Sequence, residues 1–189
     1  MHSVGTVKDE LMKKAINRIH KRLCFFLINH ILAGTGCWEL KRLLLNSLGN
    51  SIGEGCKVVA PVICTGKLIV GANCWIGRDF CVNGNGTVTI GANCDIAPNV
   101  SFQTGGHLIG DESRRAGRGV KFDFHVGDGV WIGARATFLN GVTVGDGSVI
   151  AACACVANDT PPNTLCGGVP ARVIKSLDGV VLNAEEATS

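Results

Sequence analysis

One histidine marks the point where an otherwise regular sequence breaks off. The stretch SFQTGGHLIGDESRRAGRGVKFDFHVG, residues 101–127, interrupts a regular recurrence of aliphatic residues, with His107 near its start and His125 near its end. A hydroxyl becomes a good nucleophile when a base takes its proton, and imidazole, whose ordinary pKa is about 6.5, suits that task near neutral pH. Loops on rigid scaffolds often carry function. His107 is therefore a candidate general base, and an exposed loop histidine is the alternative.

The residues on both sides of the break recur with a period of six. Positions in this series are aliphatic or Phe, and a two-residue insertion separates Val88 from Ile90: Ile52, Val58, Val70, Ile76, Val82, Val88, Ile90, Ile96, Phe102, Val126, Ile132, Phe138, Val144, Ile150 and Val156. A six-residue period fits neither a helix nor a simple two-residue alternation. It fits a short strand and a tight turn with one residue pointing inward. Such units stack, and three of them make one triangular coil of a solenoid.

Composition and charge limit the function classes. The chain has 189 residues, 26 of them Gly, with 5% aromatic and 17% charged residues, which indicates many turns and one domain with a small appendage. A net charge of +3 is too small to indicate a nucleic-acid partner. Residues 1–48 carry eight Lys and Arg against three Asp and Glu, so the charge is concentrated at the N-terminus.

The cysteines favour a reducing compartment. Three of the ten, Cys56, Cys74 and Cys94, occupy equivalent positions of the repeat, and no pair has CxxC spacing. We interpret them as packed, reduced thiols. The apolar stretch at residues 23–33 follows basic residues, but it contains Asn29 and His30 and is too short to span a bilayer. The expected location is therefore the cytoplasm.

Two segments carry a resemblance to a known family. VGDGVWIGARATFLNGVTVGDGSVIAACACV and PPNTLCGGVPARVI, within a likeness covering about 51–174, resemble the hexapeptide-repeat acyltransferases, in particular the galactoside/maltose and polysaccharide O-acetyltransferase branch. The resemblance implies an all-β solenoid, a left-handed parallel β-helix. It also implies an acetyl-CoA-dependent O-acetyltransferase that acts on a carbohydrate hydroxyl, with a surface-polysaccharide precursor as one acceptor, and a homotrimer. No metal is expected.

The resemblance also implies roles for individual residues at the reacting centre. His107, after the two glycines at the break, matches the catalytic base; Asp95 or a backbone carbonyl would orient it. Ala134, just past the WIG stretch, would donate its backbone N–H to the developing oxyanion. Trp131 would line the acceptor or acetyl pocket, and Asn83 would meet the sugar. A shielding tryptophan and a turn asparagine are the alternatives at the last two positions.

Acetyl-CoA would lie along small residues of the later coils. The matching positions are Ala134, Ala152 and Ala157, and Arg172 of the PAR ending matches an arginine near the nucleotide. The family often has a lysine where this chain has Asn158, a departure that weakens or relocates the phosphate contact. A basic group in the break, Arg114, Arg115 and Arg118, is expected to form a solvated loop; contact with an acidic sugar, a lipid pyrophosphate or a neighbouring subunit is the alternative.

We expect three parts. Residues 1–48 form helices, one from Val7 to about Leu32 and a second over Trp38–Ser47, which either cap the open first coil or touch a membrane through residues 7–33. Residues 49–160 form the β-helix, with a loop at 108–125. Residues 161–189 form the closing segment and tail.

Other functions stay open at this point. The same apparatus acetylates serine, an amino-sugar nitrogen or certain antibiotics. A γ-carbonic anhydrase-like zinc site needs three converging histidines, whereas the solenoid offers His107 and His125. A non-catalytic structural solenoid would not need a histidine at the break.

Overall fold

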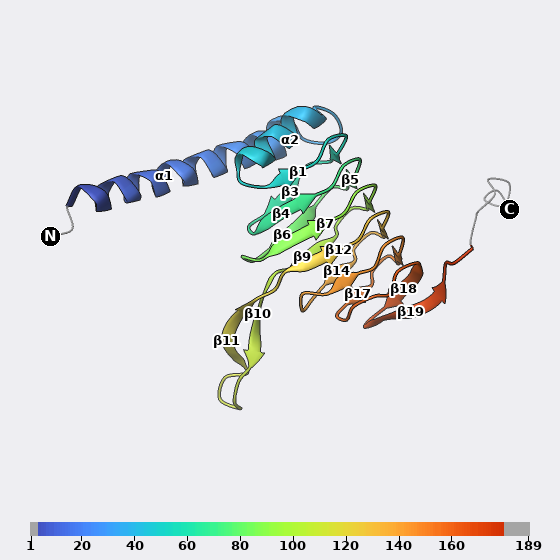
Figure 1. The fold of residues 1–189 in the computed structure, drawn as a ribbon. Helices are drawn as coiled ribbons and strands as arrows, with labels where there is room; N and C mark the ends of the chain where they lie inside the picture. Colours follow the sequence, from blue (N-terminus) through green and yellow to red (C-terminus); the bar gives the residue numbers. More distant parts are fainter. Residues whose placement is uncertain (1–3, 180–189) are drawn as a thin grey trace.

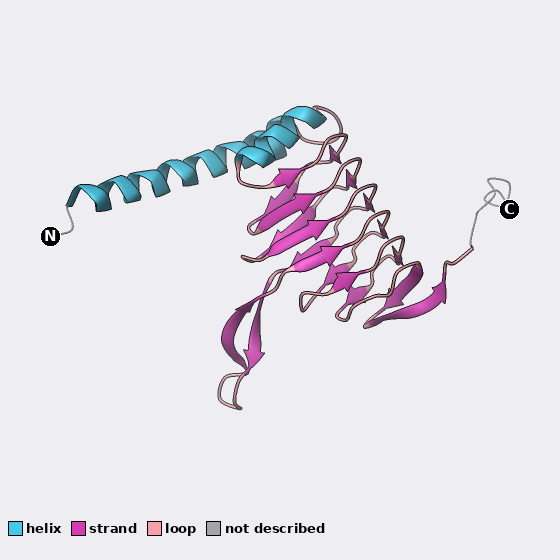
Figure 2. Cartoon of the chain, viewed as in Figure 1, coloured by secondary structure: helices cyan, strands magenta, loops and turns pink. Residues whose placement is uncertain are grey.

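The chain folds as a parallel β-solenoid with helices at one end (Figures 1 and 2), as the six-residue period predicts, and it matches the left-handed parallel β-helix that the family resemblance implies. The computed structural model describes residues 4–179. Three sheets form the faces of a triangular prism, and the chain visits them in turn. We call them face one, face two and face three, and name each corner by the faces it joins.

Each face is a stack of short strands. Face one contains β1 (Ser51–Ile52), β4 (Lys67–Val70), β7 (Thr87–Ile90), β12 (Phe124–Val126) and β15 (Thr143–Val144). Face two contains β2 (Lys57–Val58), β5 (Trp75–Ile76), β8 (Asp95–Ile96), β13 (Trp131–Ile132), β16 (Val149–Ile150), β18 (Thr164–Gly168) and β19 (Ala171–Ser176). Face three contains β3 (Val62–Cys64), β6 (Phe80–Asn83), β9 (Ser101–Gln103), β14 (Thr137–Phe138) and β17 (Cys155–Val156).

The strand register follows the repeat. Ile52 pairs with Val70, 18 positions later, whereas Ile90 pairs with Val126, 36 positions later, so the break at residues 101–127 adds the length of one coil. Every inward position predicted from the period is at most 4% exposed. Cys56, Cys74 and Cys94 are also buried, and all ten cysteines are free thiols, so the packing predicted for them is confirmed.

The added length forms a β-hairpin that leaves the prism at the three–one corner (Figure 1). Its strands are β10 (Gly105–Ile109) and β11 (Ala116–Lys121), which pair antiparallel. The excursion therefore begins before the expected residue 108 and places His107 inside a strand. His125 already belongs to the coil, because β12 pairs with β7 and β15 on face one.

The helices cover the first coil with their last turns. α1 (Val4–Phe26) continues into a π-helical turn, η1 (Leu27–Ile31), and α2 (Trp38–Ser47) follows. Cys24, Ile28 and Leu45 are buried there. Asn29 bonds both backbone groups of Val62 at 2.9 Å, which fixes η1 to β3.

A buried lysine fixes α2 in the same way. The Lys41 side chain is fully buried, and its Nζ donates to the carbonyl oxygens of Gly34 and Val58 at 2.6 and 3.1 Å. The capping role thus belongs to residues 24–47. The rest of α1 projects away from the solenoid (Figure 1), and none of the described helices is long and apolar enough to cross a membrane.

Candidate active site

His107 is held by a hydrogen bond inside the hairpin. It lies on β10 opposite Gly119, and its Nδ1 is 2.8 Å from the carbonyl oxygen of Gly117. Because a carbonyl oxygen can only accept, Nδ1 carries the proton and donates it. The Nε2 lone pair is then left for another proton, and the exposed ring makes it reachable. Of the two partners expected for His107, the geometry favours a backbone carbonyl.

The root of the hairpin is anchored on its outgoing leg. Thr104 is fully buried, and its hydroxyl donates to the carbonyl oxygen of Asn83 at 3.0 Å and accepts the Gly86 N–H at 3.1 Å. Its carbonyl oxygen accepts the Phe122 N–H at 2.9 Å, which ties the outgoing leg to the returning one. His107 therefore follows a fixed point of the scaffold.

The returning leg is anchored by a carboxylate. Asp123 accepts the backbone N–H of Thr87 at 2.7 Å and pairs with Lys121 at 3.3 Å. These contacts, the backbone hydrogen bond first, lower the pKa of Asp123, so the carboxylate is charged at neutral pH. Both legs are thus bound to neighbouring coils, and the hairpin leaves the prism in one direction.

Asn83 shares the corner from which the hairpin leaves. It ends β6 and donates from Nδ2 to Oε1 of Gln103, its partner on β9, at 3.1 Å. Gln103 lies four positions before His107 in the chain. The structure therefore brings Asn83 to the base of the hairpin that carries the histidine.

Trp131 and Asp95 lie elsewhere, on face two. Trp131 pairs with Asp95, which in turn pairs with Trp75 on the next rung. These three side chains, with Ala97 and Pro98, line an open cavity of about 520 Å³. Asp95 is therefore part of this aromatic cavity, whereas the hydrogen bond of His107 is made to Gly117.

Ala134 and Ala152 stack at the two–three corner, one coil apart. The Cys153 N–H donates to the Ala134 carbonyl at 2.8 Å, and a Cβ at Gly133 would lie 2.5 Å from the Ala152 nitrogen, so only glycine allows this approach. Among residues 4–179, no acceptor bonds the N–H of either alanine. Two unpaired backbone donors therefore lie at this corner.

The remaining predicted cofactor residues, Ala157 and Arg172, lie near the C-terminal end of the solenoid. Ala157 follows β17 at the three–one corner, and the next residues, Asn158 to Thr160, line a cavity of about 370 Å³ together with Arg172. The buried Thr160 hydroxyl lacks a partner among the described residues. The Arg172 guanidinium donates to its neighbour Ala171 at 2.8 Å. The cavity thus combines the Arg172 cation with the Asp159 carboxylate and an unpaired hydroxyl.

His125 is separate from these groups. It is exposed on face one between Thr89 and Thr143 of the neighbouring strands. The basic hairpin tip is solvated, with Arg114 and Arg118 exposed. Within the described residues, no three His, Cys, Asp or Glu side chains gather as a metal site would require.

Sequence reasoning missed Trp75 and did not identify which backbone carbonyl holds His107. Trp75 had a visible signal, because it begins a WIG triplet, like the one that Trp131 begins, with the inward Ile in second place. The carbonyl of Gly117 had none, because its position depends on the hairpin register, which shifts between His107 and Ile109.

Comparisons with known proteins agree with this architecture. The family described as bacterial transferase hexapeptide (six repeats) matches residues 125–158, and the hexapeptide repeat of succinyl-transferase matches residues 67–101. Galactoside O-acetyltransferase of Escherichia coli (strain K12) is 39% identical over 146 residues, which cover 74% of this chain and 70% of that protein.

Two solved structures are similar over most of the chain. A galactoside acetyltransferase in complex with coenzyme A has a TM-score of 0.75 and 32% identity, over 86% of this chain and 82% of the other. A maltose O-acetyltransferase from Clostridium difficile 630 has a TM-score of 0.69 and 31% identity, over 90% of both chains.

Proposed function

The chain belongs to the hexapeptide-repeat acyltransferase family, and on that premise we propose that it moves an acetyl group from acetyl-CoA to a carbohydrate hydroxyl. The observation that carries the proposal is the hydrogen bond from His107 to Gly117, which leaves Nε2 as a base on an exposed, anchored hairpin. The named relatives act on galactoside and maltose, which supports a sugar acceptor.

The proposed reaction needs one proton acceptor and one oxyanion donor. Nε2 of His107 takes the hydroxyl proton as the acceptor oxygen attacks the thioester carbonyl carbon. The carbonyl π pair moves onto oxygen, and the unpaired N–H of Ala134 stabilises that charge. Collapse expels the CoA sulfur, which takes the proton from the imidazolium. The products are an acetyl ester and free CoA, and His107 is again neutral.

Acetyl-CoA would lie along the two–three corner and end near the C-terminal cavity. The unpaired N–H groups of Ala134 and Ala152 suit the amides of the pantetheine arm, and the stacked turns let that arm approach the backbone. Ala157 immediately precedes Asn158, which lines the cavity of Arg172, and the Arg172 guanidinium suits a phosphate of the nucleotide end. Asn158 supplies a neutral amide there instead of a cation.

The chain acts as a homotrimer in this proposal. His107 leaves the prism at the three–one corner, whereas Ala134 lies at the two–three corner, so the two groups belong to different edges of one copy. In a closed ring, the hairpin of one copy reaches the two–three corner of the next. Trp131 and Asn83 would then face the acceptor from neighbouring copies.

A complementation experiment tests the shared site. His107→Ala removes the base, and Ala134→Pro removes the N–H donor, so each variant alone should be inactive. Trimers assembled from a mixture should regain activity, because some sites then combine an intact hairpin with an intact corner. An active monomer in sedimentation, or mixed trimers that stay inactive, would refute the shared site.

The acceptor class can be tested directly. We propose a surface-polysaccharide precursor, since the resembled branch includes polysaccharide O-acetyltransferases. Release of the CoA thiol should be measured with galactosides, maltose, polysaccharide fragments, amino sugars and serine. Turnover is expected with hydroxyls of carbohydrates. Turnover with serine or amino-sugar nitrogens alone would contradict the proposal.

The ten free cysteines support a reducing compartment, and we place the protein in the cytoplasm. We also propose that its N-terminal segment contacts a membrane surface, because the exposed part of α1 is basic and carries apolar side chains that nothing in the described chain covers.

A further inference from the structure

An apolar stripe runs along the projecting part of α1. Five side chains spaced by four and three residues are each more than half exposed: Met12, Ile16, Ile19, Leu23 and Phe26. Such a spacing places them on one side of a helix. Cys24 and Ile28, which pack on the first coil, lie on a different side. The stripe therefore faces away from the solenoid.

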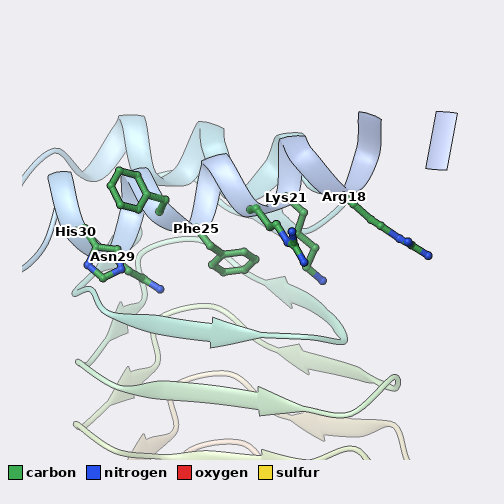
Figure 3. Close-up of a pocket in the computed structure, with 7 residues that line it drawn as sticks. Arg18, Lys21, Phe25, Asn29 and His30 are labelled. Atoms are coloured by element: carbon green, nitrogen blue, oxygen red, sulfur yellow. The ribbon is translucent and has the colours of Figure 1, made fainter. Parts of the chain in front are cut away.

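A basic cavity borders this stripe where α1 meets the first coil (Figure 3). It has a volume of about 470 Å³ and is lined by Arg18, Lys21, Arg22, Phe25, Phe26, Asn29 and His30. Figure 3 shows Phe25 and Asn29 between the helix and the strands below it, with Arg18 and Lys21 along the same helix. Phe26 belongs to both features, because it lines the cavity and ends the stripe.

The cations of the cavity lack acidic partners. The ion pairs found among residues 4–179 join Arg42 to Glu39 and Lys121 to Asp123, so Arg18, Lys21 and Arg22 take part in none. No lining residue is acidic. A floor anchored by Asn29 to Val62 and three cations without acidic partners, one of them Lys21 over the Phe25 ring at 5.9 Å, would suit a phosphate group.

We propose that this cavity is a headgroup site for an anionic phospholipid of the membrane on which the stripe of α1 rests. An amphipathic helix inserts its apolar side at the headgroup boundary, and basic side chains at its flank then reach the lipid phosphates. The cavity lies at that flank. The inference rests on the proposed membrane contact and is independent of the acetyl transfer.

Charge distinguishes this occupant from a second copy of the chain. Spacings of four and three residues also suit a coiled coil. However, Lys13, Lys14, Arg18, Lys21 and Arg22 lie along the same stretch of helix, which has no acidic residue after Glu10. Pairing two such helices would bring like charges together, whereas an anionic lipid surface neutralises them.

The test measures partition of the full-length protein into vesicles of phosphatidylcholine alone or with phosphatidylglycerol. Binding is expected with phosphatidylglycerol and should weaken with salt. Arg18→Ala/Arg22→Ala removes two cations from the cavity, and Lys13→Ala/Lys14→Ala removes two from the same helix outside it. General attraction is worth about fivefold in affinity per cation, so it costs the two double variants the same. Loss of the headgroup contacts should lower the affinity of the cavity variant at least tenfold further than that of the control.

A second pair of variants tests the stripe. Ile19→Asp and Asn17→Asp add one negative charge each, two positions apart, and only Ile19 belongs to the stripe. Ile19→Asp should abolish binding, and Asn17→Asp should reduce it about fivefold. Inorganic phosphate and glycerol phosphate, as soluble probes, should bind far more weakly than the vesicles.

Three results would overturn the proposal: equal losses for the two double variants, equal binding to both vesicle types, or concentration-dependent self-association of α1 in place of vesicle binding. Acetyl transfer to a soluble sugar should be unchanged in all four variants. Failure of the lipid site therefore leaves the proposed reaction standing, and failure of the reaction leaves the vesicle result intact.

Discussion

Nδ1 of His107 lies 2.8 Å from the carbonyl oxygen of Gly117, across the two strands of the hairpin. This bond fixes both the tautomer and the direction of the ring, so a change in the backbone of β11 should act on catalysis through the histidine. Gly117, which supplies this carbonyl, and Gly119, which pairs with His107 across the hairpin, allow a matched comparison.

Gly117→Ala should lower turnover and leave acetyl-CoA affinity unchanged. A Cβ at Gly117 would lie 2.9 Å from the Leu108 carbonyl oxygen and 3.1 Å from the Gly110 Cα, so the strand must move. A Cβ at Gly119 would meet only the Gly106 carbonyl oxygen at 3.9 Å. We expect a loss of roughly tenfold in kcat for Gly117→Ala, because small misplacement of a reacting group is costly. Gly119→Ala, measured in the same assay, should be close to wild type.

The period in the sequence was sufficient to predict the solenoid, because each inward position needs one apolar side chain of limited size. Ile132 and Val144 illustrate this, since both are buried where the six-residue count places them. The hairpin was harder to predict. Its pairing depends on backbone hydrogen bonds and a register shift after His107, and these have no periodic side-chain signal.

The helix was predicted in type but not in its contacts. The apolar residues of α1 share one side, as their spacing predicts, yet Ile19 is 66% exposed. Periodicity identifies an apolar side and does not say what covers it. In this chain the side chains of α1 and η1 that pack on the solenoid are instead Cys24 and Ile28.

Arg172→Ala should raise the KM for acetyl-CoA about tenfold, with kcat nearly unchanged. The guanidinium lies in the cavity that also contains Asn158 and Thr160, away from the hairpin, so it can contribute only to binding of the donor. Lys67→Ala removes a cation from the start of β4 and serves as the control. Initial rates at varied acetyl-CoA give the comparison. A loss of kcat with KM unchanged would contradict the assigned role.

Stability should fall in alkaline solution because of a buried thiol. Burial raises the pKa of Cys64 from 9.0 to about 11, so the folded state holds this proton after the unfolded chain has lost it. The contribution is complete below pH 9 and is lost as the pH rises toward 11, by roughly 2–3 kcal/mol. Thermal unfolding at pH 8.5 and 10.5 should show a smaller fall for Cys64→Ala than for wild type. Cys153→Ala, which removes an exposed thiol, should lose as much stability between these pH values as wild type does. A loss of stability in Cys64→Ala equal to that of wild type would refute the assignment.

The identity of the base can be tested with the two histidines of the solenoid. His107→Ala and His125→Ala should be compared for turnover with one sugar acceptor, and acetyl-CoA affinity should be measured separately by calorimetry. His107→Ala is expected to lose about 10²–10⁴ in turnover while binding acetyl-CoA nearly as wild type, because the base acts on the acceptor proton. His125→Ala should retain most of its activity. Near-normal turnover of His107→Ala, or loss of activity in His125→Ala alone, would contradict the account.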